Sequence, residues 1–304
     1  MSPVRGGQAR RPAVVAAVVA AFACALTACH GGSGKHARHA SVAPTSSSIP
    51  FSVPSSTTPA SSLPPTTAAP AAGNACTRGP DRTAAVNTFI AETRDGATLR
   101  FPAGICLRVD GTVNVVGRHG ITIDGNGAMF VRTTAQSGAF SPQWLVQTSS
   151  GITLTGLDIV GPKPQGAGFD HDYEGQPGVA IDSSTNVTFE HGVVSNVWGD
   201  FFRISNRTDG VRITDNQLTE AGRQGLAVVG GSHITFDGNV VTRARRFAVD
   251  LEPYPSTPVR GVVITNNRFF DPSVGFVCAT GYDNRCDRGS ALSDVTVANN
   301  IQEG

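Results

Sequence analysis

Short segments in which apolar and polar residues alternate recur along the C-terminal half of the chain. Segments such as GITI, GVRI and GVVI end at a large apolar anchor residue, and the anchors from Phe189 to Ile264 advance by 24, 23 and 28 residues. Alternation with a period of two predicts β-strands, and a spacing of about 23 residues predicts one coil of a solenoid. A leucine-rich repeat has a similar period, but its LxxLxL pattern is absent. The pattern therefore predicts an all-β chain folded as a parallel β-solenoid. The anchors are Ile123, Leu154, Phe189, Ile213, Phe236, Ile264 and Val297.

A polar position follows these anchors at a constant distance. The third residue after the anchor is Asn at five of the seven positions. Asn tolerates the left-handed backbone of a tight turn, and its amide can hydrogen-bond to an identical side chain one layer away. We therefore expect a column of Asn turns between stacked coils. Its residues are Asn126, Leu157, Gly192, Asn216, Asn239, Asn267 and Asn300.

One register places the apolar residues of four successive coils in two inward columns. These columns are Ile181, Ile204, Val228 and Leu251, and Val179, Phe202, Leu226 and Val249. Because side chains alternate between the two faces of a strand, the neighbouring residues point outward. The outward columns are then Ala180, Arg203, Ala227 and Asp250, and Asp182, Ser205, Val229 and Glu252.

Residues 81–93 predict a short amphipathic helix at the start of the solenoid. Ala85, Val86, Phe89 and Ile90 lie on one helical face, and Asp81 is available as N-cap. Terminal repeats of a solenoid must cover an otherwise open core. We expect the helix to cap this end.

Residues 1–28 have the composition of an export signal. Arg5, Arg10 and Arg11 precede an apolar run, and LTAC ends at Cys29. LTAC resembles a bacterial lipobox, which implies cleavage before Cys29 and attachment of a lipid to its thiol. An ordinary signal peptide and a membrane helix are the alternatives, although the run is slightly short for a membrane helix. We expect a lipoprotein at the outer face of the cell membrane, or else a secreted protein.

Residues 29–72 predict a flexible tether, and residues 73–304 predict a folded domain. The tether is rich in Ser, Thr, Pro and Ala and holds no acidic residue. The whole chain has a net charge of +1, but the domain contains 19 basic and 23 acidic residues, a net charge of −4. A nucleic-acid partner is therefore not indicated.

The domain cysteines predict disulfides, because an exported chain with an even number of cysteines commonly pairs them. With Cys29 set aside, the simplest pairing joins Cys76 to Cys106 and Cys278 to Cys286. A metal site is the weaker alternative, since CxxC pairs are missing.

The order of three segments resembles the opening of a known family. TAAVNTFIAE is followed by GATLRFPAGICLRV and then GITIDGNGAMF, as in pectate-lyase-like right-handed parallel β-helix proteins. The resemblance covers about residues 77–304. It implies three-sided coils and a family dominated by enzymes and binders that act on polysaccharides, and it is more specific for fold than for activity.

Two outward carboxylates form a candidate acid/base pair. Asp250 and Glu252 are two apart on one strand, so their Cα atoms are about 6.7 Å apart on the same face. An inverting glycosidase keeps its carboxyl groups about 6.5 to 9.5 Å apart. Arg203 lies two coils from Asp250, about 10 Å across Ala227. The alternative is a solvated ladder of compensating charges.

Further polar residues stand just ahead of these strands, and their cations can bind a uronate carboxylate or neutralise an enolate-like intermediate. They are Asp200, Arg223, Gln224, Arg245 and Arg246. GRQGLAVVGG and AVDLEP resemble uncharacterised bacterial β-helix proteins with RQG and DIEP elements, and this match covers Arg223, Gln224, Asp250 and Glu252. DGNG resembles a polygalacturonase segment, but the paired Asp, GHG and RIK motifs of that family are absent.

Inserted loops are expected to wall a cleft on this face. Residues 161–178 enter the strands from one side, and residues 253–258 and 281–291 leave from the other. Trp198, Phe201 and Tyr254 can stack on sugar rings, although Trp198 equally fits packing between coils.

The segment GFDHDYEG places Asp170, His171, Asp172, Tyr173 and Glu174 in one run. It resembles, without the proline, the Asp-Pro-His-Asp loop of alginate epimerases and related lyases, which implies proton transfer by His171 and Tyr173. Histidine is the side chain suited to proton transfer near neutral pH, and His171 is the best-placed one for this role. Asp170, Asp172 and Glu174 also allow a Ca²⁺ site, the one cofactor that the sequence suggests, and an ordinary polar loop is the alternative.

Two classes of function follow from these patterns. The first is an enzyme (lyase, epimerase or glycosidase) that acts on an acidic, uronic-acid-containing polysaccharide, with Asp250, Glu252, Arg203, Arg223 and His171 as catalytic residues. Its substrate-binding residues would be Asp200, Gln224, Arg246, Trp198, Tyr254 and Asp182. The second is a non-catalytic module that binds glycan or stabilises the envelope. We expect the enzyme.

Overall fold

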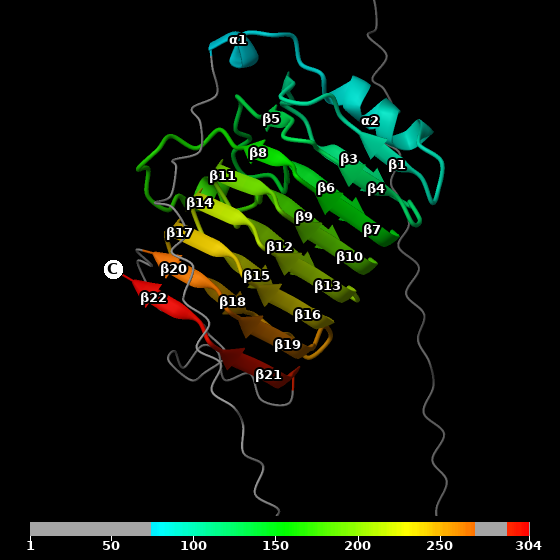
Figure 1. Ribbon diagram of the computed structural model, residues 1–304. Helices are drawn as coiled ribbons and strands as arrows, with labels where there is room; N and C mark the ends of the chain where they lie inside the picture. The colour runs from blue at the N-terminus through cyan, green and yellow to red at the C-terminus, as the bar shows by residue number, and fades with distance from the viewer. Residues whose placement is uncertain (1–73, 271–290, 304) are drawn as a thin grey trace, which may run out of the picture. The chain divides into compact units, whose positions relative to one another are not determined.

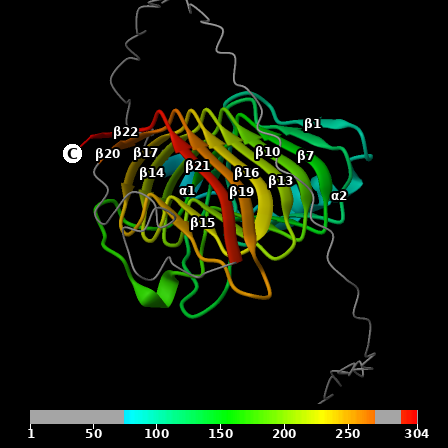
Figure 2. The same cartoon turned by 90° about the horizontal axis from the view of Figure 1, so that it is seen from below.

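The described part of the chain coils into a parallel β-helix. The computed structural model describes residues 74–270 and 291–303. Every ladder between the named strands is parallel, and neighbouring strands of one sheet come from successive coils. In Figure 1 the coils follow one another from the cyan helices to the red strands, and Figure 2 shows them stacked behind β21. The expected all-β solenoid is confirmed.

Three sheets, here called A, B and C in the order in which each coil visits them, form the sides of the helix. Sheet A contains β1 (Thr98–Arg100), β4 (Thr122–Asp124), β7 (Ser150–Thr155), β10 (Thr185–Glu190), β13 (Asp209–Thr214), β16 (Gly231–Asp237), β19 (Val259–Thr265) and β21 (Leu292–Ala298). Sheet B contains β2 (Cys106–Arg108), β5 (Met129–Val131), β8 (Asp158–Val160), β11 (Val193–Val197), β14 (Gln217–Ala221), β17 (Val240–Ala244), β20 (Arg268–Phe270) and β22 (Ile301–Glu303). Sheet C contains β3 (Val113–Val116), β6 (Trp144–Gln147), β9 (Val179–Asp182), β12 (Phe202–Ser205), β15 (Leu226–Val228) and β18 (Val249–Leu251).

The predicted register of sheet C is confirmed residue by residue. Phe202 pairs with Val179 and Leu226, and Arg203 pairs with Ala180 and Ala227. Ala227 in turn pairs with Asp250. All eight residues of the two inward columns are at most 1% exposed. The register therefore sends Arg203 and Asp250 out of the core on the same face, as the alternation requires.

Buried Asn side chains tie four coils together. Asn216 Nδ2 donates to Asn239 Oδ1 at 2.9 Å, Asn239 Nδ2 to Asn267 Oδ1 at 3.0 Å, and Asn267 Nδ2 to Asn300 Oδ1 at 2.9 Å. Each Oδ1 also accepts the backbone N–H of the preceding coil's Asn. Each Nδ2 reaches back to a carbonyl, such as Ile213 O at 2.9 Å from Asn239. This arrangement, called the Asn ladder below, satisfies amides that burial would otherwise make costly.

Two details of the Asn prediction are wrong. In these coils the left-handed residue stands one position before the ladder, for example Asp215 with φ 56° and Asn266 with φ 57°. Asn126 is itself left-handed, with φ 50°, but lies outside the ladder. Four residues separate β4 from β5, whereas two separate β13 from β14, so the buried Ala128 occupies the ladder position of its coil.

A helix covers the N-terminal end of the core, as expected. Helix α2 (Thr83–Glu92) packs against β3 and buries Val86 and Ile90 within the main core. Phe89 is 49% exposed, so the buried stripe is narrower than predicted. The N-cap position is Arg82 and not Asp81, although Asp81 Oδ1 accepts the Thr83 N–H at 2.9 Å.

A disulfide fastens this end of the chain. Cys76, in helix α1 (Asn74–Thr77), is bonded to Cys106 in β2, with Cα atoms 5.6 Å apart. The first predicted pairing is therefore confirmed. The second, between Cys278 and Cys286, lies outside the described residues, as do the export signal, Cys29 and the tether. No helix among residues 74–270 and 291–303 is long and apolar enough to cross a membrane.

The Asn ladder generates a stability prediction. Replacing Asn239 with Ala removes an amide that bonds both to the adjacent coils and to the Ile213 carbonyl, and it leaves the buried amide of Asn216 without its acceptor. Buried unsatisfied groups cost about 1–3 kcal/mol each, so we expect a loss of roughly 2–4 kcal/mol in the free energy of unfolding. Chemical denaturation measures this loss.

Asn266→Gly is the matched control, because it removes an exposed amide next to the ladder and keeps a left-handed residue in place. We expect this control to lose less than about 1 kcal/mol. Equal losses in the two variants would mean that the ladder contributes no special stability.

Candidate functional site

Acidic side chains surround a single arginine where the strands of sheet C begin and end. Arg223 and Gln224 immediately precede β15, Asp200 precedes β12, and Asp250 lies in β18 with Glu252 just after it. Glu174 comes from the loop between β8 and β9. Parallel pairing of β12, β15 and β18 brings these segments from successive coils side by side. We call the resulting group the acidic cluster; it comprises Glu174, Asp200, Arg223, Gln224, Asp250 and Glu252.

Arg223 links the members of the acidic cluster. Its Nη1 donates to both oxygens of Asp200 at 3.1 and 3.0 Å and to Gln224 Oε1 at 2.6 Å. Its Nη2 donates to Glu252 Oε1 at 2.7 Å, and its Nε lies 3.7 Å from Glu174 Oε2. The guanidinium is therefore held by carboxylates on several sides and is not available to bind a substrate anion.

Gln224 joins the two carboxylates of the sheet. Its side chain is fully buried, and its Nε2 donates to Asp250 Oδ2 and, at 3.2 Å, to Glu252 Oε1. Its backbone N–H donates to Asp200 Oδ1 at 3.1 Å. Gln224 thus holds the carboxyl groups of Asp200, Asp250 and Glu252 in place from the buried side. This position corrects its assignment as a substrate-binding residue.

Burial and charge together leave a proton in the acidic cluster. Burial, together with the charge of Glu252 and the hydrogen bond between the two carboxyl groups, raises the pKa of Asp250 to about 8. Burial alone would raise the pKa of Glu252, but attraction by Arg223 and hydrogen bonds from Asp250, Gln224 and Arg223 lower it. Near neutral pH the pair therefore carries one proton, on Asp250.

The pKa values of Asp200 and Arg223 are shifted as well. Burial raises the pKa of Asp200 to about 6, against the attraction of Arg223. Burial would also lower the pKa of Arg223, but Asp200 and Glu252 outweigh that effect and raise it. Arg223 stays charged under all ordinary conditions and keeps Glu252 ionised.

A hydrogen bond with Glu252 contributes to the raised pKa of Asp250. An inverting glycosidase instead places a water between carboxyl groups about 6.5 to 9.5 Å apart. The Cα spacing on the strand did permit such a gap, but the side chains turn toward each other. This pair is therefore suited to holding and releasing a proton.

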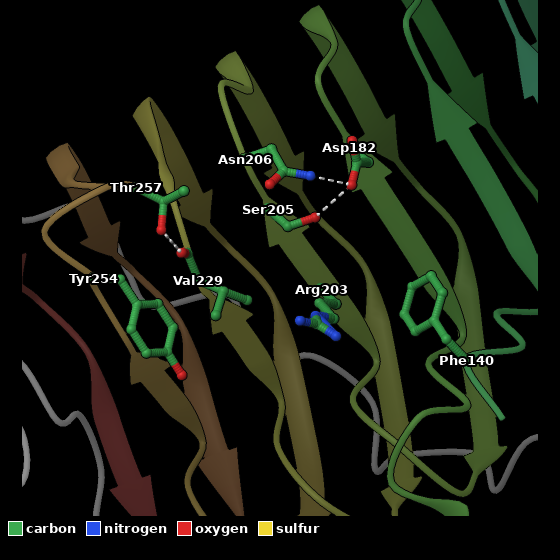
Figure 3. Close-up of a pocket in the computed structure, with 8 residues that line it drawn as sticks. All are labelled: Phe140, Asp182, Arg203, Ser205, Asn206, Val229, Tyr254 and Thr257. Atoms are coloured by element: carbon green, nitrogen blue, oxygen red, sulfur yellow. Dashed lines mark hydrogen bonds between the residues drawn. The ribbon is translucent and has the colours of Figure 1, made fainter. Parts of the chain in front are cut away.

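A pocket of about 330 Å³ lies on the outer face of sheet C, and no member of the acidic cluster lines it. Figure 3 shows Phe140 and Tyr254 on either side of Arg203. The Arg203 guanidinium lies 5.3 Å from the Phe140 ring and forms no ion pair with a carboxylate among the described residues. The lining residues are Phe140, Asp182, Arg203, Ser205, Asn206, Val229, Tyr254 and Thr257.

Asp182 lies across this pocket from Tyr254, and its carboxylate accepts hydrogen bonds from its neighbours. Ser205 Oγ donates to Oδ2 at 3.0 Å and Asn206 Nδ2 donates to the same oxygen at 2.6 Å (Figure 3). Ser183 Oγ donates to Oδ1 at 2.6 Å. Arg203, Asp182 and Tyr254, all predicted from the sequence, therefore line one pocket.

The aromatic predictions are only partly correct. Tyr254 is 44% exposed in the pocket, but Phe201 is fully buried in the core and cannot meet a sugar. Trp198 stacks on Tyr173, with ring centroids 4.7 Å apart. Trp198 therefore holds the loop between β8 and β9 against the coils, a role that neither of its two predicted interpretations described.

His171 stands at the surface of that loop. It begins the turn η1 (His171–Tyr173), its side chain is 82% exposed, and its Nδ1 lies 3.5 Å from Glu174 Oε1. Asp170 caps the turn by accepting the Asp172 N–H at 3.0 Å. The structure thus connects His171 to the acidic cluster only through Glu174.

Among the described residues, no group of three or more His, Cys, Asp and Glu side chains is arranged to hold a metal ion, and the Ca²⁺ site stays a prediction.

The two remaining arginines do not join the acidic cluster. Arg246 lies 5.2 Å over the Phe169 ring, and Arg245 Nη2 pairs with Glu220 at 3.1 Å. Glu220 also binds Arg243 and, at 3.0 Å, Lys163 at the start of the loop. This buried network fixes the loop to sheet B. The sequence does not reveal it, because its members are spread over 83 positions.

Asn206 and Thr257 line the pocket without having been named in the sequence analysis, and so does Phe140. It belongs to the segment between β5 and β6, within the 31-residue step from Ile123 to Leu154. A step longer than one coil indicates an inserted loop, and that signal would have pointed to Phe140.

Comparison with known proteins agrees with this architecture. A family model described as "Right handed beta helix region" matches residues 108–301, which supports the predicted handedness. No curated protein matches the chain. An alginate lyase from Paenibacillus sp. superposes with a TM-score of 0.52 at 13% identity, covering 72% of this chain and 74% of that one.

Two further solved structures are similar over less of their own length. A family 28 exopolygalacturonase from Yersinia enterocolitica gives a TM-score of 0.47 at 11% identity, over 75% of this chain and 56% of that one. A GH87 α-1,3-glucanase from Streptomyces thermodiastaticus gives 0.43 at 15% identity, over 75% and 52%. At these identities the similarities establish the fold alone.

The proton on Asp250 generates a pH prediction. The pKa of Asp250 rises from 3.8 to about 8 on folding, so its contribution to stability is complete below about pH 4 and declines as the pH rises to 8. Asp250→Asn cannot titrate. We therefore compare the melting temperature of Asp250→Asn with that of the wild type at each pH. As the pH rises from 4 to 8, this difference should shift by about 3 °C or more in favour of the variant.

Asp215→Asn is the control, because its side chain is 60% exposed on a turn. Its melting curve should run parallel to that of the wild type across the same pH range. If the Asp250→Asn curve also runs parallel, Asp250 does not hold the proton.

Proposed function

Because the chain belongs to the right-handed β-helix family, we propose that the outer face of sheet C binds an acidic polysaccharide and cleaves it by β-elimination. One observation carries this proposal: Arg203, a cation without a carboxylate partner among the described residues, lines a pocket on the same face of sheet C as a carboxyl pair that retains a proton, two coils away. An elimination on a uronic acid needs both a cation for the sugar carboxylate and a proton donor.

Arg203 and the two aromatic rings form the binding surface. A guanidinium binds a carboxylate through two parallel hydrogen bonds, and the rings of Phe140 and Tyr254 offer apolar faces to a sugar. Neutralising the carboxylate of a uronic acid stabilises the enolate that forms when the C5 proton leaves. Arg203 would therefore act both in binding and in the chemical step.

Glu252 and Asp250 supply the proton for the leaving group. The Glu252 side chain is 22% exposed, whereas Asp250 is 5% exposed, so Glu252 is the more accessible member of the pair. The C5 proton passes to a base, its electrons form the enolate, and the C4=C5 bond forms as the C4–O4 bond breaks. The departing O4 takes the proton that the pair held on Asp250, passed on through Glu252.

Two groups of the pocket have an oxygen that can take the C5 proton. They are the Asp182 carboxylate and the Tyr254 oxygen, the latter only after its hydroxyl has lost its own proton. Product assays with Asp182→Asn and Tyr254→Phe assign the role, because only one of the two variants should lose the elimination activity. The fold shared with an alginate lyase is compatible with such a reaction, and alginate is a polymer of uronic acids.

A non-catalytic glycan-binding module is the second candidate function. It is favoured by the burial of Asp250 and by the many hydrogen bonds that Arg223 and Gln224 make to the carboxylates, since these features also stabilise a structural cluster. The two candidates differ in one respect. A binder retains its affinity when Glu252 is neutralised, and an enzyme loses its turnover.

Time-resolved proton NMR of the full-length protein with uronic-acid and neutral polysaccharides tests the proposal. We expect vinyl signals of unsaturated uronate with the wild type. Glu252→Gln should reduce the rate by about 100-fold or more, because a positioned acid contributes about 10²–10⁴-fold. Asp215→Asn, on the turn between β13 and β14 and outside the pocket lining, should leave the rate unchanged.

Other products would redirect the conclusion. New reducing-end anomers without vinyl signals would indicate a hydrolase, and altered residue ratios without cleavage would indicate an epimerase. An unchanged spectrum with every polysaccharide, together with measurable binding, would indicate the binding module.

The rate should also follow the protonation of the pair. A general acid is active only while protonated, so we expect kcat to fall tenfold per pH unit above about pH 8, the pKa of Asp250. A rate that keeps rising beyond pH 9 would contradict this assignment.

We further propose, from the sequence alone, that the protein is exported and anchored to the membrane by a lipid on Cys29. Metabolic labelling with a fatty acid tests this, since Cys29→Ala should carry no label. Ca²⁺ binding by Asp170, Asp172 and Glu174 is likewise a proposal, which calcium titration of the wild type and of Asp172→Asn addresses.

A further inference from the structure

We infer that a second pocket, at the corner between sheets C and A, is an additional binding site for an anionic sugar of the same polymer chain. This pocket has a volume of about 370 Å³. The inference rests on the proposed function, because it extends the ligand that occupies the Arg203 pocket. It also commits the protein to oligosaccharides with several negative charges.

The two pockets are adjacent. Asn206 and Thr257 line both of them, Asn206 from the turn after β12 and Thr257 from the loop between β18 and β19. Thr257 is held in place by donating its Oγ1 hydrogen to Val229 O at 3.0 Å. A chain that extends from the first pocket past these two residues therefore meets the second pocket.

Arg207 and Arg260 give the second pocket its charge. Both line the pocket and are exposed. Neither forms an ion pair with a carboxylate anywhere in residues 74–270 and 291–303. Arg203, Arg207 and Arg260 thus form a series of three unneutralised cations over the two pockets. Arg223, Arg243, Arg245 and Arg268, by contrast, all pair with carboxylates.

Asp209 follows Arg207 by two residues but makes no hydrogen bond or ion pair with either arginine. Asp209 accepts hydrogen bonds from Ser232 Oγ at 2.6 Å and lies 2.7 Å from His233 Nδ1. Its hydrogen bonds are thus directed to the neighbouring coil and not to either arginine. Ser232 also lines the pocket, and Ser256 adds a second hydroxyl.

The size of the two pockets favours an oligosaccharide over a single sugar. Each volume, about 330 and 370 Å³, lies at the lower end of the range of roughly 300–1,000 Å³ for ligand sites. A disaccharide that fills the Arg203 pocket would not contact Arg207 or Arg260. A longer acidic oligosaccharide would contact all three arginines and gain affinity from the added charge pairs.

Calorimetric titration of the full-length protein tests the inference. The probes are the disaccharide and the hexasaccharide of galacturonic acid and of guluronic acid, measured in a Glu252→Gln background that prevents cleavage. We expect the Arg207→Ala, Arg260→Ala double variant to weaken hexasaccharide binding by about tenfold or more. Disaccharide binding should stay unchanged.

Arg212→Ala is the matched control. Arg212 is also exposed and forms no ion pair among the described residues, but it lines neither pocket. Its hexasaccharide affinity should equal that of the parent. Melting temperatures of all variants confirm that the fold is intact.

The outcomes separate this inference from the proposed function. If Arg203→Ala abolishes binding while the double variant binds the hexasaccharide like its parent, the second pocket is overturned and the function stands. If the double variant loses hexasaccharide affinity while Arg203→Ala and the cleavage assay show no effect, the second pocket stands and the proposed function is overturned. If neither oligosaccharide binds at all, both are overturned.

Discussion

The vertical alignment of successive coils is the constraint on which the rest of the molecule depends. Parallel pairing alone permits a coil to slide by two residues and still keep its apolar face inward. The Asn ladder removes that freedom, because each amide must meet both its counterpart and a carbonyl in the adjacent coil. The carboxyl and guanidinium groups on the outer face are positioned by this buried alignment.

The acidic cluster shows how a rigid scaffold creates unusual acidity. Asp250 and Glu252 are neighbours on a strand whose direction the ladders fix, so their mutual repulsion cannot be relieved by moving apart. Arg223 compensates one negative charge, and a retained proton compensates another. Burial by Gln224 and Arg223 keeps water from screening the pair, which makes the proton difficult to remove near neutral pH.

The sequence predicted the repeat and its consequences better than the details of the site. Period, register and inward columns follow from alternation, so Arg203, Asp182 and Asp250 were placed on the correct face. The side-chain directions were not predictable. Whether Asp250 turns toward Glu252, or Trp198 toward Tyr173, depends on contacts with loops whose paths alternation does not determine. Asn126 was misplaced because the constant spacing from the anchor assumes a two-residue turn, whereas four residues separate β4 from β5.

The bond between Cys76 and Cys106 has a consequence for the order in which the molecule unfolds. Each coil of a solenoid contacts only its neighbours, so unfolding proceeds from an end toward the middle. The first coil is covalently held to α1 and covered by α2, whereas Leu292, Val295 and Val297 in β21 are only partly buried. Under mechanical load or heat the coils should therefore peel away from β21 toward β1. The N-terminal coils would be the last to come apart, and they are also the nearest in sequence to the predicted membrane anchor.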